Sequence, residues 1–238
     1  HSGEPEAKRL NVWMLGNSYT GQTWRQRDGF LKADPEINVA ITVIAPGGRQ
    51  IRQLLQNSKV QDAIQGNKAW NFVALQEQSQ TPAFAMSEGD GTDRARDALD
   101  AGAPQMIPFI QRHQPGAQVV LFETWARHRD PDKFDTLKVF GGDPAAMQEA
   151  LCKGYRRMLK HGGENGWDFR KTARIAPVGR AWEAWYKAKG YNGATVKLHK
   201  NDNYNTAQLG DYPTDLECEE NLTARRFADA ANTDGATA

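Results

Sequence analysis

The chain has 238 residues, of which 39% are hydrophobic, and its 30 basic and 29 acidic residues give a formal net charge of +1. This near balance excludes both the basic surface of a nucleic-acid-binding protein and the composition of an acidic disordered tail. The apolar runs are too short to cross a bilayer, so no membrane partner is expected either. The length fits one α/β domain over residues 1–238, with a polar C-terminal segment at 213–238.

Five short apolar runs predict β-strands, because each is rich in Val, Ile, Leu or aromatic residues and ends in Gly, Pro or polar residues. In chain order they are Leu10–Leu15, Val39–Ala45, Trp70–Leu75, Gln118–Glu123 and Ala173–Val178. Helical patterns lie between or after them, at residues 50–57, 92–113, 143–162 and 179–190. Alternating strands and helices predict a three-layer α/β/α sandwich with a five-stranded parallel sheet in the flavodoxin-like order 2-1-3-4-5.

The first strand stops abruptly at Gly16-Asn17-Ser18. In a sheet of this order, ligands bind beyond the carboxyl ends of the strands, where the order reverses between the first and third strands. Ser18 follows the first strand directly. A serine at the start of a helix is usually an N-cap, so its position alone leaves Ser18 either as a cap or as a nucleophile.

Four blocks of the sequence, in this order, resemble the SGNH, or GDSL-like, hydrolase family. They are GNSYT at 16–20, IAPGGRQI at 44–51, LQEQSQ at 75–80 and DNYNTAQLG at 202–210. The likeness is greatest to a branch in which LQEQSQ replaces the family's Gly-x-Asn-Asp block, and it spans roughly residues 10 to 212. It implies a three-layer α/β/α fold and ester hydrolysis through a serine nucleophile, with no cofactor.

The resemblance also implies the roles of individual residues. Ser18 is the expected nucleophile, and its backbone N–H at a helix N-terminus is expected to help stabilise the oxyanion. Gly48 is the second expected oxyanion donor, with Gly47 as the alternative. The third donor, an Asn amide in the family, is replaced by glutamine, since Gln also carries an amide N–H. Gln80 aligns with that Asn in the related QGESN pattern, and Gln76, nearest the strand end, is its rival.

The fourth block departs from the family pattern, which is Asp-x-x-His followed by a Gly five residues later. Asp202 and Gly210 fit this pattern, but Asn205 occupies the position of the histidine. An amide has no useful basicity near neutral pH, so it cannot take the proton from Ser18. In serine hydrolases the loss of this histidine costs a rate factor on the order of 10⁶. His199 is a candidate alternative base, because a His-x-x-Asp pair can touch within one helical turn.

The other histidines and the cysteines predict neither a metal centre nor a disulfide. His128 follows the fourth strand and is a further candidate base, but no pair of histidines has metal-ligand spacing. Cys152 lies in the helix before the fifth strand and Cys218 in the segment after it. Right-handed crossovers place these two segments on opposite faces of the sheet, so both thiols are expected to be free.

The sequence therefore predicts a serine ester hydrolase that deacylates small acyl esters, such as acetyl groups on carbohydrate, with its activity impaired or rerouted by Asn205. The alternative is a catalytically inactive binding protein of the same fold that holds acylated glycans. The chain begins at His1 rather than Met, which leads us to expect a secreted or periplasmic mature protein. Its oligomeric state cannot be read from the sequence.

Overall fold

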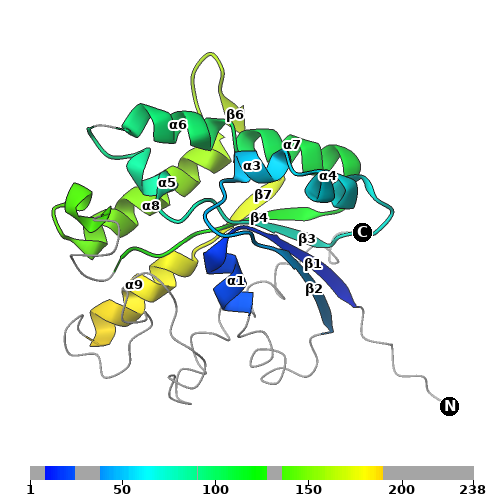
Figure 1. Ribbon diagram of the computed structural model, residues 1–238, viewed down its shortest axis with the longest axis horizontal. Coiled ribbons are helices and arrows are strands. Elements are labelled where there is room, and N and C mark those ends of the chain that lie inside the picture. Colours follow the sequence, from blue (N-terminus) through cyan, green and yellow to red (C-terminus); the bar gives the residue numbers. More distant parts are fainter. Residues whose placement is uncertain (1–8, 25–37, 90, 128–135, 190–238) are drawn as a thin grey trace.

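A computed structural model describes residues 9–24, 38–89, 91–127 and 136–189 of the chain. Its centre is a parallel sheet of five strands in the order β2-β1-β3-β4-β7 (Figure 1). The strands are β1 (Leu10–Leu15), β2 (Val39–Ile44), β3 (Phe72–Leu75), β4 (Gln118–Phe122) and β7 (Ala173–Ala176). Because β7 is the fifth strand predicted from the sequence, the expected flavodoxin-like order is confirmed.

Helices cover both faces of the sheet. They are α1 (Ser18–Trp24), α3 (Ile51–Leu55), α4 (Ser58–Gln65), α5 (Thr81–Phe84), α6 (Thr92–Asp100), α7 (Ala103–His113), α8 (Pro144–Leu159) and α9 (Val178–Lys189). A 3-10 turn, η1 (Thr136–Phe140), and a small antiparallel pair, β5 (Lys160–His161) and β6 (Trp167–Asp168), complete the described elements. Figure 1 shows helices α3 to α8 on one face and α1 and α9 on the other, which is the predicted three-layer sandwich.

The side chains of β1 alternate between the two faces of the sheet, as the period of a strand requires. Trp13 and Leu15 are fully buried in the larger core, on the side of α3 to α8. Val12 and Met14 point to the opposite face and pack with Phe72 in a smaller cluster. This alternation explains why the strand reads as a nearly continuous apolar run, since both of its faces are covered.

The structure divides one predicted helix into two and confirms the start of another. The pattern at 92–113 forms two helices that are separated at Gly102, with Pro104 in the first turn of α7 and Pro108 inside it. Helix α8 begins as expected, because the Asp143 carboxylate accepts a hydrogen bond from the N–H of Ala145 at 2.9 Å. Its apolar face is buried against the rest of the core, as the three- to four-residue spacing predicts.

The cysteine prediction is tested only in part. Cys152 lies on α8, is buried and has a free thiol, whereas Cys218 lies outside the described residues. Figure 1 places α8 and α9 on opposite faces of the sheet, as the crossover argument requires. None of the helices in the described ranges has both the length and the apolar character that a membrane span needs.

Candidate active site

The ends of β1 and β3 lie next to each other and bring the first and third blocks together. Leu15 pairs with Leu75, and the N–H of Gln76 donates to the carbonyl of Leu15 at 2.8 Å. On the other side of β1, the N–H of Gly16 donates to the carbonyl of Ile44 at 3.0 Å. The loops that carry Ser18, Gly48 and the glutamines therefore leave the sheet side by side, at the switch point of the strand order.

Asn17, and not Ser18, caps helix α1. Its side-chain oxygen accepts a hydrogen bond from the N–H of Tyr19 at 3.2 Å, which is the N-cap interaction. Its amide nitrogen donates to the carbonyl of Arg49 at 3.1 Å and to that of Glu77 at 3.2 Å, so Asn17 joins three loops. Ser18 is the first residue of the helix and is exposed. Its hydroxyl has no hydrogen-bond partner within the described ranges.

The side chain of Gln76 makes all of its hydrogen bonds to residues of this turn and to its own loop. Its oxygen accepts from the N–H groups of Asn17 and Thr20 and from the Thr20 hydroxyl, at 3.2, 3.1 and 2.7 Å. Its amide group donates to the Asn17 side-chain oxygen at 3.0 Å and to the backbone carbonyl of Glu77. A Cβ at Gly16 would lie 2.1 Å from the Thr20 hydroxyl oxygen, so only glycine allows this close approach. Both amide hydrogens of Gln76 are engaged, which gives this residue a positioning role and leaves neither for an oxyanion.

Gly48 lies in the turn between β2 and α3. Its φ of +70° is in the left-handed region that favours glycine. A Cβ at Gly48 would meet nothing within 4 Å, so its backbone conformation, and not crowding, requires glycine there. Gly47 precedes it and is also exposed. Within the part of the chain that the structure describes, the N–H of Gly48 donates to no acceptor. This N–H is therefore available to a ligand.

Gln80 has a different environment from Gln76. Its side-chain oxygen accepts from Thr136 at 2.8 Å and from the Arg127 guanidinium at 3.2 Å. Because arginine only donates, the atom that faces it must be the amide oxygen, and the –NH₂ group must be the free end. Gln80 is half-buried and lines a cavity. It is therefore the glutamine with an amide N–H that a ligand can reach.

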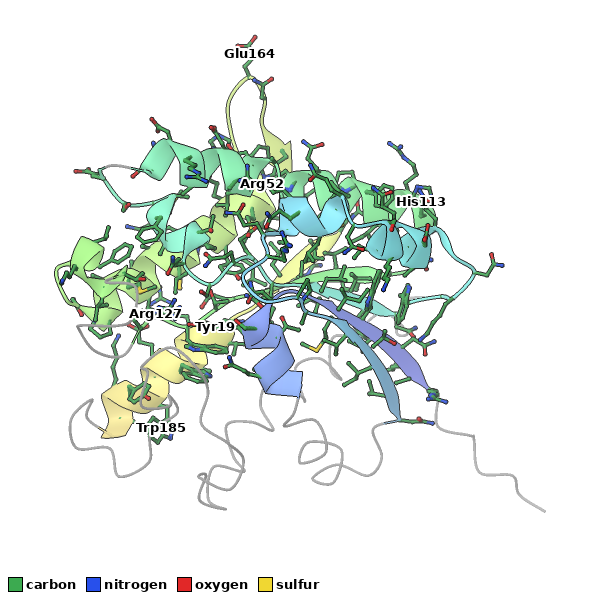
Figure 2. The ribbon with its side chains drawn as sticks, in the orientation of Figure 1. Tyr19, Arg52, His113, Arg127, Glu164 and Trp185 are labelled. Atoms are coloured by element: carbon green, nitrogen blue, oxygen red, sulfur yellow. The ribbon has the colours of Figure 1, made fainter. Side chains whose placement is uncertain are left out.

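Arg127 connects Gln80 to helix α1, which begins at Ser18. Its guanidinium is 2% exposed and donates to the phenol oxygen of Tyr19, to Gln80 and, at 3.4 Å, to the Ser79 hydroxyl. Figure 2 shows Arg127 beside Tyr19 at the carboxyl edge of the sheet. Tyr19 in turn stacks on Trp125 with a centroid distance of 4.3 Å. A buried cation and an aromatic stack thus fix the spacing between α1 and the third block.

The cavity that Gly48 and Gln80 share has a volume of about 490 Å³, within the range of small-molecule sites. Its described lining is mostly amides and guanidinium groups, and Phe84 is the one large apolar side chain among these residues. The lining residues are Gly48, Gln50, Arg52, Gln53, Gln78, Gln80, Thr81, Phe84, Gly91, Arg94 and Ala95. Ser18 is not among these lining residues, so its role as the nucleophile stays a prediction.

Glu77 precedes the lining residue Gln78 and is fully buried. Its carboxylate accepts from the N–H of Gln78 at 2.7 Å and from the N–H of Ile51, the first residue of α3, at 3.3 Å. Burial raises the pKa of Glu77 to about 7, although these hydrogen bonds and the nearby Arg52 charge oppose the shift. The carboxyl group ties the third block to α3 and is close to half-protonated at neutral pH.

Comparison with solved structures shows where this architecture recurs. A DUF4886 family protein from Bacteroides uniformis matches with a TM-score of 0.61 and 14% identity, over 84% of this chain and 77% of that one. A variant of the acetylxylan esterase Axe2 from Geobacillus stearothermophilus matches with a TM-score of 0.51 and 10% identity, over 83% and 87%. The lipase Lip_vut3 from a goat rumen metagenome matches with a TM-score of 0.52 and 11% identity, over 90% and 97%. The fold is that of the SGNH hydrolases.

No family model matches the sequence, and no curated protein matches it. At 10 to 14% identity, the likeness to SGNH hydrolases concerns the fold alone. The SGNH resemblance read from the sequence is confirmed at that level. The activity and the site residues of this chain depend on the geometry of the site itself.

The fourth SGNH block lies outside the described residues. Asp202, Asn205, Gly210 and the alternative base His199 all fall in that part of the chain, as does His128. Their predicted roles are therefore untested. Within the described ranges there is no group of three or more His, Cys, Asp or Glu side chains that could hold a metal ion.

Arg127 and Glu77 were not singled out as site residues from the sequence. Arg127 lies in the loop after β4, and Glu77 lies within LQEQSQ, one of the blocks that carried the SGNH resemblance. A charged residue in the loop that follows a buried strand was the available signal, because a charge is kept there only with partners.

Proposed function

We propose that the chain is a serine ester hydrolase that removes small acyl groups, such as acetyl, from carbohydrate. The main support is the state of Ser18. It is exposed at the end of β1, and Asn17 takes over the capping of α1, so the hydroxyl is left available for reaction. The amide-rich cavity supports a carbohydrate substrate, because amides can both donate to and accept from sugar hydroxyls.

The proposed oxyanion donors are the backbone N–H groups of Ser18 and Gly48 and the side-chain amide of Gln80. Gly48 and Gln80 line the same cavity, and Arg127 holds the oxygen of the Gln80 amide. Donors fixed before the reaction stabilise a developing negative charge without reorganisation, and each contributes a factor of about 10²–10³ in kcat. Gln76 supports this set indirectly, by holding the turn that carries Ser18.

In the proposed reaction, the Ser18 oxygen attacks the ester carbonyl and its proton passes to a base. The tetrahedral oxyanion then collapses, the C–O bond to the sugar breaks, and the sugar oxygen takes up that proton. Water hydrolyses the acyl-serine, releasing the carboxylic acid and restoring the Ser18 hydroxyl. With Asn205 in place of histidine, the proton has no basic side chain to accept it at that position. The chain is therefore expected to be slow.

Restoring the histidine tests this proposal. We expect Asn205→His to raise the hydrolysis of 4-nitrophenyl acetate by at least about 10²-fold, because general base catalysis contributes about 10²–10⁴. Asp202 and Gly210 already surround this position as the family pattern requires. The measurement is kcat/KM for the parent chain and the variant at neutral pH.

Ser18→Ala in the Asn205→His background is the control, and it should remove the gained activity. If the parent chain is already fast and Asn205→His adds nothing, another group is the base, and His199→Gln then shows whether it is His199. If neither form hydrolyses the ester but both bind acetylated sugars, the chain is the glycan-binding protein that Asn205 also suggests.

A further inference from the structure

The cavity beside the proposed oxyanion donors carries positive charge. Arg52 of α3 and Arg94 of α6 line it, and none of the described residues that line it is Asp or Glu. Four other arginines of the described chain have a carboxylate partner within 4 Å: Arg96, Arg157, Arg170 and Arg180. In the same ranges, Arg52 and Arg94 have no such partner. Among the described residues, no carboxylate is therefore paired with the two guanidinium groups that line the cavity.

Arg52 is held in place by neutral groups. Its Nε donates to the side-chain oxygen of Gln50 at 2.7 Å, and the Gln50 amide donates to the Thr81 hydroxyl at 3.3 Å. The side chain is half-buried, and its two terminal nitrogens are left for other acceptors. A guanidinium fixed in this way loses little conformational entropy when it binds a carboxylate or a phosphate.

Glu77, whose carboxyl group interacts electrostatically with Arg52, does little to neutralise it. Glu77 directs its carboxyl group at the N–H groups of Ile51 and Gln78 and is fully buried. Its pKa of about 7, raised by burial, leaves it only partly ionised at neutral pH. The cavity therefore keeps a net positive charge under the conditions in which an ester would bind.

We propose that this cavity is a subsite for an anionic oxygen group, a carboxylate or a phosphate, carried by the acylated substrate next to its ester. Arg52 and Arg94 bind the anion, and the glutamines and Phe84 contact the rest of the molecule. The inference rests on the proposed esterase function, because Gly48 and Gln80 line the same cavity. It narrows the substrate from acylated carbohydrates in general to those with an acidic group.

Binding of a matched pair of esters tests the subsite without relying on turnover. The full chain with Ser18→Ala is titrated calorimetrically with 4-acetoxybenzoate and with its neutral methyl ester, at low salt. We expect the anion to bind about tenfold or more tightly, as charge-assisted hydrogen bonds imply. Arg52→Gln together with Arg94→Gln should abolish this preference.

The control is Arg112→Gln, which removes one arginine charge from an exposed position near the C-terminal end of α7, at the opposite edge of the sheet. It should keep the preference for the anion. Raising the salt concentration should weaken that preference in the parent chain, which gives a second measurement that needs no substitution. Titration with 4-acetoxyphenyl phosphate then identifies which of the two anions binds more tightly.

Equal affinity for the two esters in the parent chain overturns the subsite, and so does a preference that survives in the double variant. Either result stands even if Asn205→His proves to be an active esterase. Conversely, a preference that depends on Arg52 and Arg94 supports the subsite even if no variant hydrolyses any ester. The failure of the subsite and the failure of the esterase proposal are thus distinguishable.

Discussion

Two glutamines of one loop, four residues apart, have opposite environments. Gln76 is 1% exposed, and its amide group donates to Asn17 and to the backbone of Glu77. Gln80 is half-buried and presents its amide to a cavity, while Arg127 holds its oxygen. The same change at the two positions should therefore have different consequences, which separates a positioning role from an oxyanion role.

Changing each glutamine to glutamate replaces the amide N–H group by an oxygen and keeps the other oxygen. Gln76→Glu places that new oxygen against the acceptors on Asn17 and Glu77, so we expect the free energy of unfolding to fall by about 2–4 kcal/mol. Gln80→Glu still accepts from Arg127, so its stability should change by less than about 1 kcal/mol. In the Asn205→His background, however, Gln80→Glu should lower kcat by about 10²-fold or more.

Urea denaturation and 4-nitrophenyl acetate kinetics of the two variants provide the measurements. A Gln80→Glu enzyme with undiminished kcat would exclude Gln80 as an oxyanion donor. A fully stable Gln76→Glu protein would contradict the buried hydrogen-bond network.

The sequence could not separate these two glutamines, because both follow the same strand and both carry the same amide. It also left Ser18 open as a cap, since Ser and Asn are almost equally good N-caps. The structure decides this point through one contact, from the N–H of Tyr19 to the Asn17 side chain. The sequence indicated only that the expected catalytic histidine is replaced by Asn205, and this residue lies outside the described part of the chain.

Helix α5 is the element that carries Gln80 as its N-cap, and it packs tightly on α8. At Gly154, in the middle of α8, a Cβ would lie 2.3 Å from the carbonyl oxygen of Pro82 in α5. The backbones of the two helices therefore approach as closely as only glycine permits. Through this contact, α8 sets the position of α5 and of Gln80 at its start.

Gly154→Ala tests this contact between elements. An alanine in the middle of a helix normally stabilises it by about 1 kcal/mol relative to glycine. Here we expect the reverse, a loss of about 1–3 kcal/mol in the free energy of unfolding, because the two backbones must move apart. Gly116→Ala is the control, since a Cβ there meets nothing within 4 Å. It should change stability by no more than about 0.5 kcal/mol, and a neutral Gly154→Ala would contradict the close packing.

The ends of the five strands and of the long helices were predicted to within three residues, except where the pattern at 92–113 divides into α6 and α7. Each strand is an apolar run closed by Gly, Pro or polar residues, and that signal is local. Helix α5 and the β5–β6 pair were not predicted, because they have four residues and two residues per strand and show no periodicity. Such short elements form where tertiary packing holds them, as α8 holds α5.

At the scale of the whole molecule, the site exists because the sheet brings separate segments to one edge. Ser18 follows β1, Gly48 follows β2, and Gln80 follows β3, and buried polar side chains fix these loops to one another. Asn17 and Glu77 make these connections. The loops are thus part of the cooperative structure, and the protonation of a buried group among them should affect the stability of the entire chain.

Glu77 provides the test of this coupling. Its pKa rises from about 4.5 to about 7 on folding because burial disfavours the carboxylate. Between these two pH values the folded state binds more protons than the unfolded state, so the free energy of unfolding must fall as the pH rises. A shift of this size corresponds to about 3 kcal/mol of unfolding free energy. This contribution is fully present below about pH 4.5 and has disappeared once the pH rises above about 7.

Glu77→Gln has no proton to gain or lose and can still accept from Ile51 and Gln78, because one oxygen of Glu77 serves both N–H groups. We therefore expect the parent to lose about 3 kcal/mol of unfolding free energy relative to this variant between pH 4.5 and pH 8. Urea denaturation at a series of pH values measures the difference, in which all other titrating groups cancel. Glu88→Gln, an exposed change of the same charge, should follow the parent's profile. A constant difference between parent and Glu77→Gln would show that Glu77 has the same pKa in the folded and the unfolded protein, and that burial does not raise it.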